Sequence, residues 1–286
     1  YIYYGNAAAS DYAVGATYGR DNTWTKYVAV YHMQEDPSGT APQIVDSTGN
    51  GWDGTSAGTM TSGDVVAGKL AGKAIAFDGT DDEINIGNIA SSILTAGTSD
   101  TLWISSWIKR PLLTTDHYIL SVGQFVGMGI INSPADNWYM QSSGDNSLDD
   151  PSGAIPDDVW SHLVGVWEES ATYLGWMDGV QVINDTTTDG EGVSALDGFI
   201  GDGSGSASGR NIAGSIDEVR VAASNLGGSW AITERNNHND TSTFYSVSSQ
   251  ELSGGTDVNS ERDAEVTGVD TANAERDSEI SGVDTD

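Results

Sequence analysis

The side chains best suited to catalysis in this sequence are four histidines and a few closely spaced carboxylates. Glu168 and Glu169 are adjacent, so a strand would point them to opposite faces. Asp81, Asp82 and Glu83 fall in a predicted turn. None of the histidines has a serine or cysteine partner in a recognisable nucleophile turn: His32, His117, His162 and His238. These patterns predict a protein that is not an enzyme.

A turn rich in oxygen atoms offers a different chemistry, the binding of a cation. Residues 46–53 read DSTGNGWD and provide the side chains of Asp46 and Asn50, together with carbonyls that the glycines make accessible. Calcium takes six to eight oxygen ligands from flexible loops of this kind. The sequence therefore predicts that Asp46 and Asn50 bind calcium. The alternative is an Asx turn at Asp46 that binds nothing.

Aromatic residues in the predicted loops offer a third chemistry, the binding of sugars. Such sites combine an aromatic surface with a few amide or carboxylate hydrogen bonds. We expect Trp138, with Asp136 and Asn137, to bind a glycan, although each loop aromatic could instead pack in the core or rim. The loop aromatics are Trp52, Trp138, Tyr139 and Trp230.

Short strands and glycine turns must position these groups. The chain of 286 residues has 36 glycines, 6 prolines and 9 tryptophans, which favours many short strands over helices. Asp178-Gly179 is a signal for a two-residue hairpin of type I′. Strands are expected at residues 27–32, 74–77, 83–86, 101–110, 118–122, 128–131, 137–141, 159–167, 173–177, 180–183, 198–201 and 214–221.

Three local details follow from the two-residue period of a strand. The segments 74–77 and 83–86 are predicted to form a hairpin with Ile75 and Phe77 on one face. Trp103 and Trp107 are expected on one side of their strand. Residues 142–158 show no periodicity and are predicted to be a loop.

Several short motifs, in this order and spacing, resemble those of laminin-G-like, concanavalin A-like jelly-roll domains. Ala222 departs from the pattern, because the family has an aromatic residue there. The resemblance spans roughly residues 27–235 and implies an all-β fold, a two-sheet antiparallel jelly-roll sandwich. The motifs are DSTGNGWDG at 46–54, AIAFDG at 74–79, EINI at 83–86, WSHL at 160–163, DGV at 178–180 and GSIDEVRV at 214–221.

The resemblance also implies the remainder of the calcium site. In the family the loop at 46–53 and the closing strand lie close together around a calcium ion, which adds Asp217 and Glu35 to Asp46 and Asn50. The alternative is an Asp217 that faces solvent. Glucanases of the superfamily carry catalytic carboxylates on one strand as E-x-D-x-x-E, and this chain has no such motif. The comparison favours recognition over hydrolysis.

The charge excludes some partners. With 42 acidic and 11 basic residues, the formal net charge is -31. This disfavours nucleic acid and anionic membrane surfaces as partners, and no apolar run is long enough for membrane insertion. Acids spread through the whole chain resemble halophilic proteins, whose self-repulsion is screened by salt. A calcium-rich extracellular protein of a marine mesophile is the alternative.

The chain is predicted to have three parts. Residues 1–26 resemble the tail of a prokaryotic module often found before such domains, or form a linker or edge strand. Residues 27–247 form the jelly-roll domain. Residues 248–286 contain a 14-residue repeat, which is two heptads with alternating apolar and polar layers. This pattern predicts a coiled-coil stalk that makes a homo-oligomer, with a trimer favoured; the alternative is a disordered acidic linker.

These observations predict an extracellular recognition or adhesion module. It would bind glycans or a glycosylated surface protein and would be displayed on an oligomeric fibre at a cell surface or virion. A viral tail fibre and a prokaryotic adhesin fit the residues equally. One alternative is a structural spacer domain of an appendage without glycan binding. Another is a polysaccharide-acting glycoside hydrolase.

Overall fold

A computed structural model describes most of the chain between residues 13 and 239. Contacts divide the chain into a unit of residues 10–235, which contains both sheets, and a unit of residues 1–9 and 236–286. The repeats at 248–286 lie outside the described residues, so the stalk stays a prediction. The described residues are 13–17, 19–70, 72–94, 100–123, 126–131, 137–141, 148–169, 171–186, 196–203 and 209–239.

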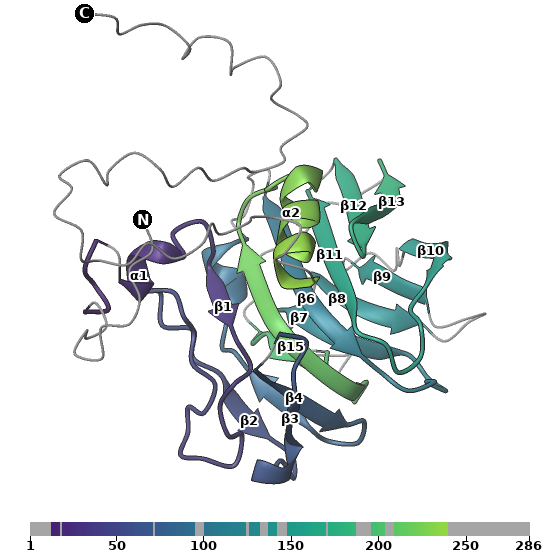
Figure 1. Ribbon diagram of the computed structural model, residues 1–286. Helices are drawn as coiled ribbons and strands as arrows, with labels where there is room; N and C mark the ends of the chain where they lie inside the picture. The colour runs from purple at the N-terminus through teal and green to yellow at the C-terminus, as the bar shows by residue number, and fades with distance from the viewer. Residues whose placement is uncertain are drawn as a thin grey trace, which may run out of the picture. The chain divides into compact units, whose positions relative to one another are not determined.

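Two antiparallel sheets form the body of the larger unit (Figure 1). The first has the order β13-β12-β11-β6-β15-β4-β3, and β1 also pairs with β15. Its strands are β1 (Ala29–Tyr31), β3 (Val65–Ala67), β4 (Lys73–Asp78), β6 (Thr101–Lys109), β11 (Ser161–Glu168), β12 (Thr172–Met177), β13 (Val180–Asp185) and β15 (Ala213–Ala222).

The second sheet has the order β10-β9-β8-β7-β14-β5-β2. Together the two sheets confirm the predicted all-β sandwich. Its strands are β2 (Thr55–Ala57), β5 (Glu83–Asn85), β7 (His117–Val122), β8 (Val126–Ile131), β9 (Asn137–Gln141), β10 (Leu148–Ala154) and β14 (Phe199–Ile200).

Helices are few and short in the described part of the chain. They are α1 (Arg20–Thr23), α2 (Gly228–Asn239) and the 3-10 turns η1 (Ser62–Asp64) and η2 (Ile89–Ser92). In Figure 1, α2 lies in front of the first sheet, beside β15 and β11. No helix among the described residues has the length and apolarity needed to cross a membrane.

The core lies between the sheets, where glycines on one sheet leave room for large side chains from the other. Trp138 on β9 is fully buried and packs against Gly175 on β12 of the opposite sheet. A Cβ at Gly175 would lie 2.4 Å from the Trp138 ring, so glycine is required there. A second cluster, with Trp103 and Ala231, fills the space between the outer face of the first sheet and α2. Each buried large side chain stabilises the fold by roughly 1.5–3 kcal/mol.

Most of the local predictions agree with the structure, and two are wrong. The turn between β12 and β13 is confirmed: Asp178 and Gly179 have φ of 50° and 81°, as a type I′ turn requires. The predicted hairpin of residues 74–86 is wrong, because β4 belongs to the first sheet and β5 to the second. Part of the predicted loop 142–158 is a strand, β10, which pairs with β9.

Candidate functional site

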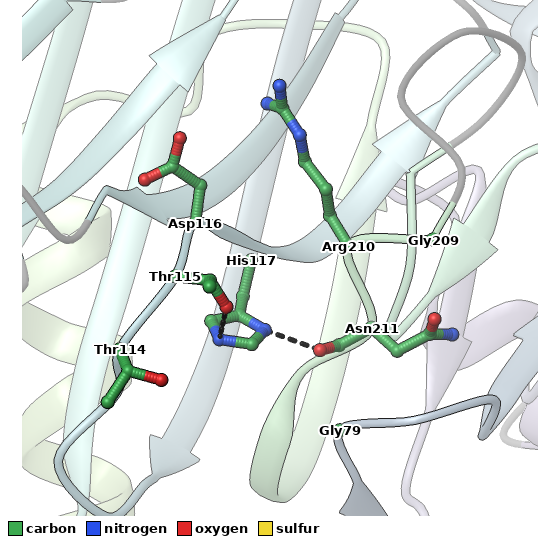
Figure 2. Close-up of a pocket in the computed structure, with 8 residues that line it drawn as sticks. All are labelled: Gly79, Thr114, Thr115, Asp116, His117, Gly209, Arg210 and Asn211. Carbon is green, nitrogen blue, oxygen red and sulfur yellow. Dashed lines mark hydrogen bonds between the residues drawn. The ribbon is translucent and has the colours of Figure 1, made fainter.

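An open pocket of about 480 Å³ lies where three segments meet (Figure 2). One is residues 114–117, which lead into β7, and another is residues 209–211, which lead into β15. The third is Gly79 in the turn between β4 and β5. Strands of both sheets therefore position the pocket, and the volume falls within the roughly 300–1,000 Å³ usual for small-ligand sites.

His117 fastens two of these segments together. Its Nδ1 hydrogen-bonds to the Asn211 carbonyl, and its Nε2 lies 3.1 Å from the Thr115 hydroxyl. Because a carbonyl can only accept, Nδ1 carries a hydrogen. Both ring nitrogens are thus engaged within the protein, so His117 shapes the pocket and has no free nitrogen for proton transfer to a ligand.

A buried carboxylate fixes the segment that carries Arg210. Asp202 accepts hydrogen bonds from the backbone N–H groups of Gly209 and Arg210, at 3.1 and 2.9 Å. The side chain of Asn211 donates to the backbone carbonyl of Asp82 at 3.2 Å. Two charge-assisted hydrogen bonds and one neutral bond therefore hold this wall against the rest of the domain.

The two charged side chains of the pocket lining lie on facing segments. Figure 2 shows the Asp116 carboxylate and the Arg210 guanidinium extending in the same direction from the two segments that flank His117. The exposed Thr114 hydroxyl lies on the same segment as Asp116, whereas the Thr115 hydroxyl contacts His117. Carboxylate, guanidinium and hydroxyl groups together can bind a ligand rich in hydroxyl groups.

The acidic residues near the pocket do not have the arrangement that glycoside hydrolysis uses. Asp116 is the one acid among the lining residues that the structure describes. Burial raises the pKa of Glu83. The negative charge of Asp202, and a hydrogen bond between the two carboxyl groups, raise the Glu83 pKa further. Carboxyl groups in hydrogen-bond contact are closer than the roughly 5 Å that separates a nucleophile from its acid partner. The spacing of Glu83 and Asp202 is therefore that of a structural contact and not that of a catalytic pair.

Two of the predicted glycan-binding residues, Trp138 and Asn137, are buried, and the prediction of Trp138 as a sugar surface is wrong. Trp138 is 0% exposed and packs between the sheets, so neither face of its ring can meet a sugar. Asn137 is also buried. Asp136 lies outside the described residues. The strand at 137–141 was expected, but β9 is buried on both of its faces, which the sequence did not show.

The carboxylate of Asp46, one of the predicted calcium ligands, is occupied by the turn itself, whereas the bond made by Asn50 uses its amide hydrogens and not the oxygen that would bind calcium. The Asp46 carboxylate accepts from the backbone of Val30, Thr48 and Trp52 and from the Thr48 hydroxyl, at 2.7–3.1 Å. Four hydrogen bonds use all of its usual acceptor sites. The Asn50 side chain donates to the Val28 carbonyl at 2.9 Å, which points its amide hydrogens into the fold.

The other two predicted ligands do not join them. Asp217 is 0% exposed and accepts from the backbone N–H of Lys69 at 2.8 Å, while its Oδ1 has no hydrogen-bond partner among the described residues. Glu35 accepts from Gln34 N–H at 3.1 Å. Among the described residues, Asp46, Asp217 and Glu35 form no cluster of ligand atoms within 4.8 Å. The four residues are therefore not assembled around one ion.

Sequence reasoning missed the pocket because its residues lie in short polar runs at strand starts. Thr114–His117 precedes the apolar part of β7, and Arg210-Asn211 precedes β15. The signal was an arginine in a chain with few basic residues, placed just before the closing strand. What the sequence did not show is that the two runs are neighbours, joined by the bond from Tyr118 N–H to the Arg210 carbonyl at 2.9 Å.

Solved structures with the same fold include sugar-binding and toxin domains. Domain 4 of AbnA, a GH43 extracellular arabinanase from Geobacillus stearothermophilus, solved in complex with arabinotriose, has a TM-score of 0.52 at 20% identity, covering 73% of this chain and 97% of that one. The binding domain of Paraclostridial Mosquitocidal Protein 1 has a TM-score of 0.51 at 14% identity, covering 75% and 52%.

The receptor binding domain of botulinum neurotoxin C/D mosaic serotype has a TM-score of 0.52 at 14% identity, covering 74% of this chain and 51% of that one. The chain therefore spans about half the length of the two toxin domains. No curated protein sequence matches the chain. A family model described as the concanavalin A-like lectin/glucanases superfamily matches residues 78–231, more than half of the chain. The chain belongs to this superfamily.

Proposed function

We propose that this domain is a non-catalytic, lectin-like module that binds a glycan in the pocket of Figure 2. The observation that carries the proposal is the arrangement of Arg210, Asp116 and the Thr114 hydroxyl on facing segments of one pocket. A guanidinium can donate two parallel hydrogen bonds to neighbouring oxygens of a sugar, and a carboxylate can accept from two neighbouring hydroxyls.

Structural neighbours support a carbohydrate as the ligand class. The AbnA domain was solved with arabinotriose, and the neurotoxin domain is a receptor binding domain. The proposal also fits the acidic chain, because the Arg210 side chain offers a local positive charge on a protein with net charge -31. A sugar that carries a carboxylate is a good candidate ligand for this reason.

Binding without bond cleavage is part of the proposal. Hydrolysis by the common mechanisms needs two carboxylates, roughly 5–9.5 Å apart, on either side of the scissile bond. Among the described residues, Asp116 is the one acid on the pocket lining, and His117 uses both ring nitrogens within the fold. This geometry supports recognition over catalysis.

We further propose that the module is displayed in several copies on an extracellular fibre or surface. The support is the 14-residue repeat within residues 248–286. Linking several weak sites raises the apparent affinity without any new contact. Light scattering of the chain with and without residues 252–286 tests this part. We expect the truncated chain to be a monomer, and an unchanged oligomer after truncation would contradict it.

A glycan array at high salt tests the binding site directly. We expect the chain to bind a defined group of glycans and Arg210→Ala to weaken that binding at least tenfold. Lys26→Ala is a matched control, because it also removes one exposed positive charge, from a segment that is not part of the pocket lining. Equal binding by both variants would place the ligand elsewhere. Turnover of a polysaccharide would favour the hydrolase, and no binding to any glycan the spacer.

A further inference from the structure

Three carboxylates gather in the turn that leads from β4 to β5. One carboxylate oxygen each of Asp78, Asp81 and Asp82 lies within 4.8 Å of the others. Two oxygens bound to one calcium ion at 2.3–2.6 Å can be at most about 5 Å apart. A single ion therefore can reach all three. These residues are different from Asp46, Asn50, Glu35 and Asp217, which the sequence analysis had assigned to calcium.

A second observation indicates that a ligand belongs there. Asp82 is only 2% exposed, and its Oδ1 is buried with no hydrogen-bond partner among the described residues. Its other oxygen, Oδ2, accepts from the Asp78 backbone N–H at 2.9 Å. A buried acceptor without a partner costs about 1–3 kcal/mol, and more if it is charged. Oδ1 is thus the oxygen left for a cation.

The surroundings of the cluster add negative charge. In the described part of the chain, no lysine, arginine or histidine forms an ion pair with any of the three carboxylates. The three carboxylate charges repel one another at this short separation. A bound divalent cation would relieve this repulsion.

We propose that the β4–β5 turn binds one calcium ion through Asp78, Asp81 and Asp82, with water completing the coordination. Hard oxygen ligands in an open, partly exposed turn suit calcium better than smaller or softer metals. The ion would brace a turn that passes from one sheet to the other. It would also steady the pocket wall, because the Asp82 carbonyl accepts from Asn211 and Gly79 lines the pocket.

Calorimetric titration of the chelator-treated full chain with calcium chloride tests this proposal. High salt and excess magnesium suppress loose binding to the many other acids. We expect one calcium ion per chain. Asp81→Asn and Asp82→Asn should each weaken its binding at least tenfold, while Asp46→Asn and Asp217→Asn leave it within twofold. Asp81 is exposed, so its substitution leaves the fold intact, as far-UV circular dichroism can verify.

Two results would overturn the proposal. One is that the wild-type chain binds no calcium in the titration, which would mean that the three carboxylates need no cation. The other is calcium binding that survives Asp81→Asn and Asp82→Asn but is lost in Asp46→Asn or Asp217→Asn. Neither result depends on whether the pocket binds a glycan, because the titration contains calcium and no sugar.

Discussion

Arg220 on β15 donates a hydrogen bond to Glu234 on α2, with 2.6 Å between Nη1 and Oε1 and both side chains buried. A second donor of Arg220 reaches Glu218 at 2.6 Å, and the Ser105 hydroxyl donates to Glu234 at 2.7 Å. His32 in turn lies 2.9 Å from Glu218. This buried network ties the helix to the closing strand. Burial alone would raise the pKa of Glu234, but the charge of Arg220 reverses the effect and lowers it to about 2.

Breaking this pair from one side should be strongly destabilising. We expect Glu234→Leu to lower the free energy of unfolding by about 3–5 kcal/mol, because it leaves the Arg220 charge buried without its main partner. The double variant Arg220→Met with Glu234→Leu should recover a large part of that loss. Urea denaturation of the three proteins measures both values. A double variant no more stable than the single one would show that the network matters for packing more than for charge.

The contact between Gly175 and Trp138 predicts a steric effect between the sheets. Gly175→Ala places a Cβ 2.4 Å from the Trp138 ring, which the surrounding core cannot accommodate without movement. We expect a loss of about 1–3 kcal/mol in the free energy of unfolding. Gly15→Ala is the control, because nothing lies within 4 Å of a Cβ at that position. Urea denaturation should show little change for Gly15→Ala, and equal effects of the two variants would contradict this account.

The strands were predictable because their signals are local. The two-residue period of a strand and the Asp178-Gly179 turn are both signals between neighbouring residues. They were therefore enough to predict that β12 pairs with β13. The hairpin at 74–86 was wrong for a non-local reason. The same apolar alternation suits a hairpin or a crossing between sheets, and only packing of the whole sandwich decides between them.

The site was harder to predict because it depends on burial and on distant neighbours. Trp138 was assigned to a rim loop, although β9 lies between β10 and β8 in the second sheet and directs the ring into the core. Asp46 and Asp217 have the right chemistry for calcium, but backbone hydrogen bonds use both oxygens of Asp46, and Asp217 is not close to the other predicted ligands. The sequence names the ligand atoms available and cannot show which are already occupied.

Asp202 is expected to act on the pocket as a positioning residue. Its carboxylate holds the backbone of Gly209 and Arg210, and Asp202→Asn should loosen that wall by removing one of two charge-assisted hydrogen bonds. We expect glycan affinity to fall about tenfold, which by the usual conversion is about 1.4 kcal/mol. Thermal unfolding in the absence of sugar provides the control. Weaker binding at an almost unchanged Tm supports positioning, whereas unchanged affinity would show that the wall is fixed by other contacts.

Asp217 predicts how stability depends on pH. Burial raises the pKa of Asp217 from its ordinary 3.8 to about 6, and the charge of Glu218 adds to the increase. The folded protein therefore binds the proton more tightly than the unfolded chain between these two values. Stability from this residue is complete below pH 3.8 and is lost as the pH rises through about 6, by roughly 3 kcal/mol.

The neutral variant Asp217→Asn isolates this effect from the titration of the other acids. Because the amide has no proton to lose, the variant should gain up to roughly 3 kcal/mol relative to wild type when the pH is raised from about 4 to about 7. Asp158→Asn, which changes an exposed carboxylate, should show no such gain. Urea denaturation at both pH values, in the presence of chelator, measures the difference. A constant difference between Asp217→Asn and wild type would contradict this prediction, because it would mean that the folded protein stabilises the buried carboxylate in its charged form.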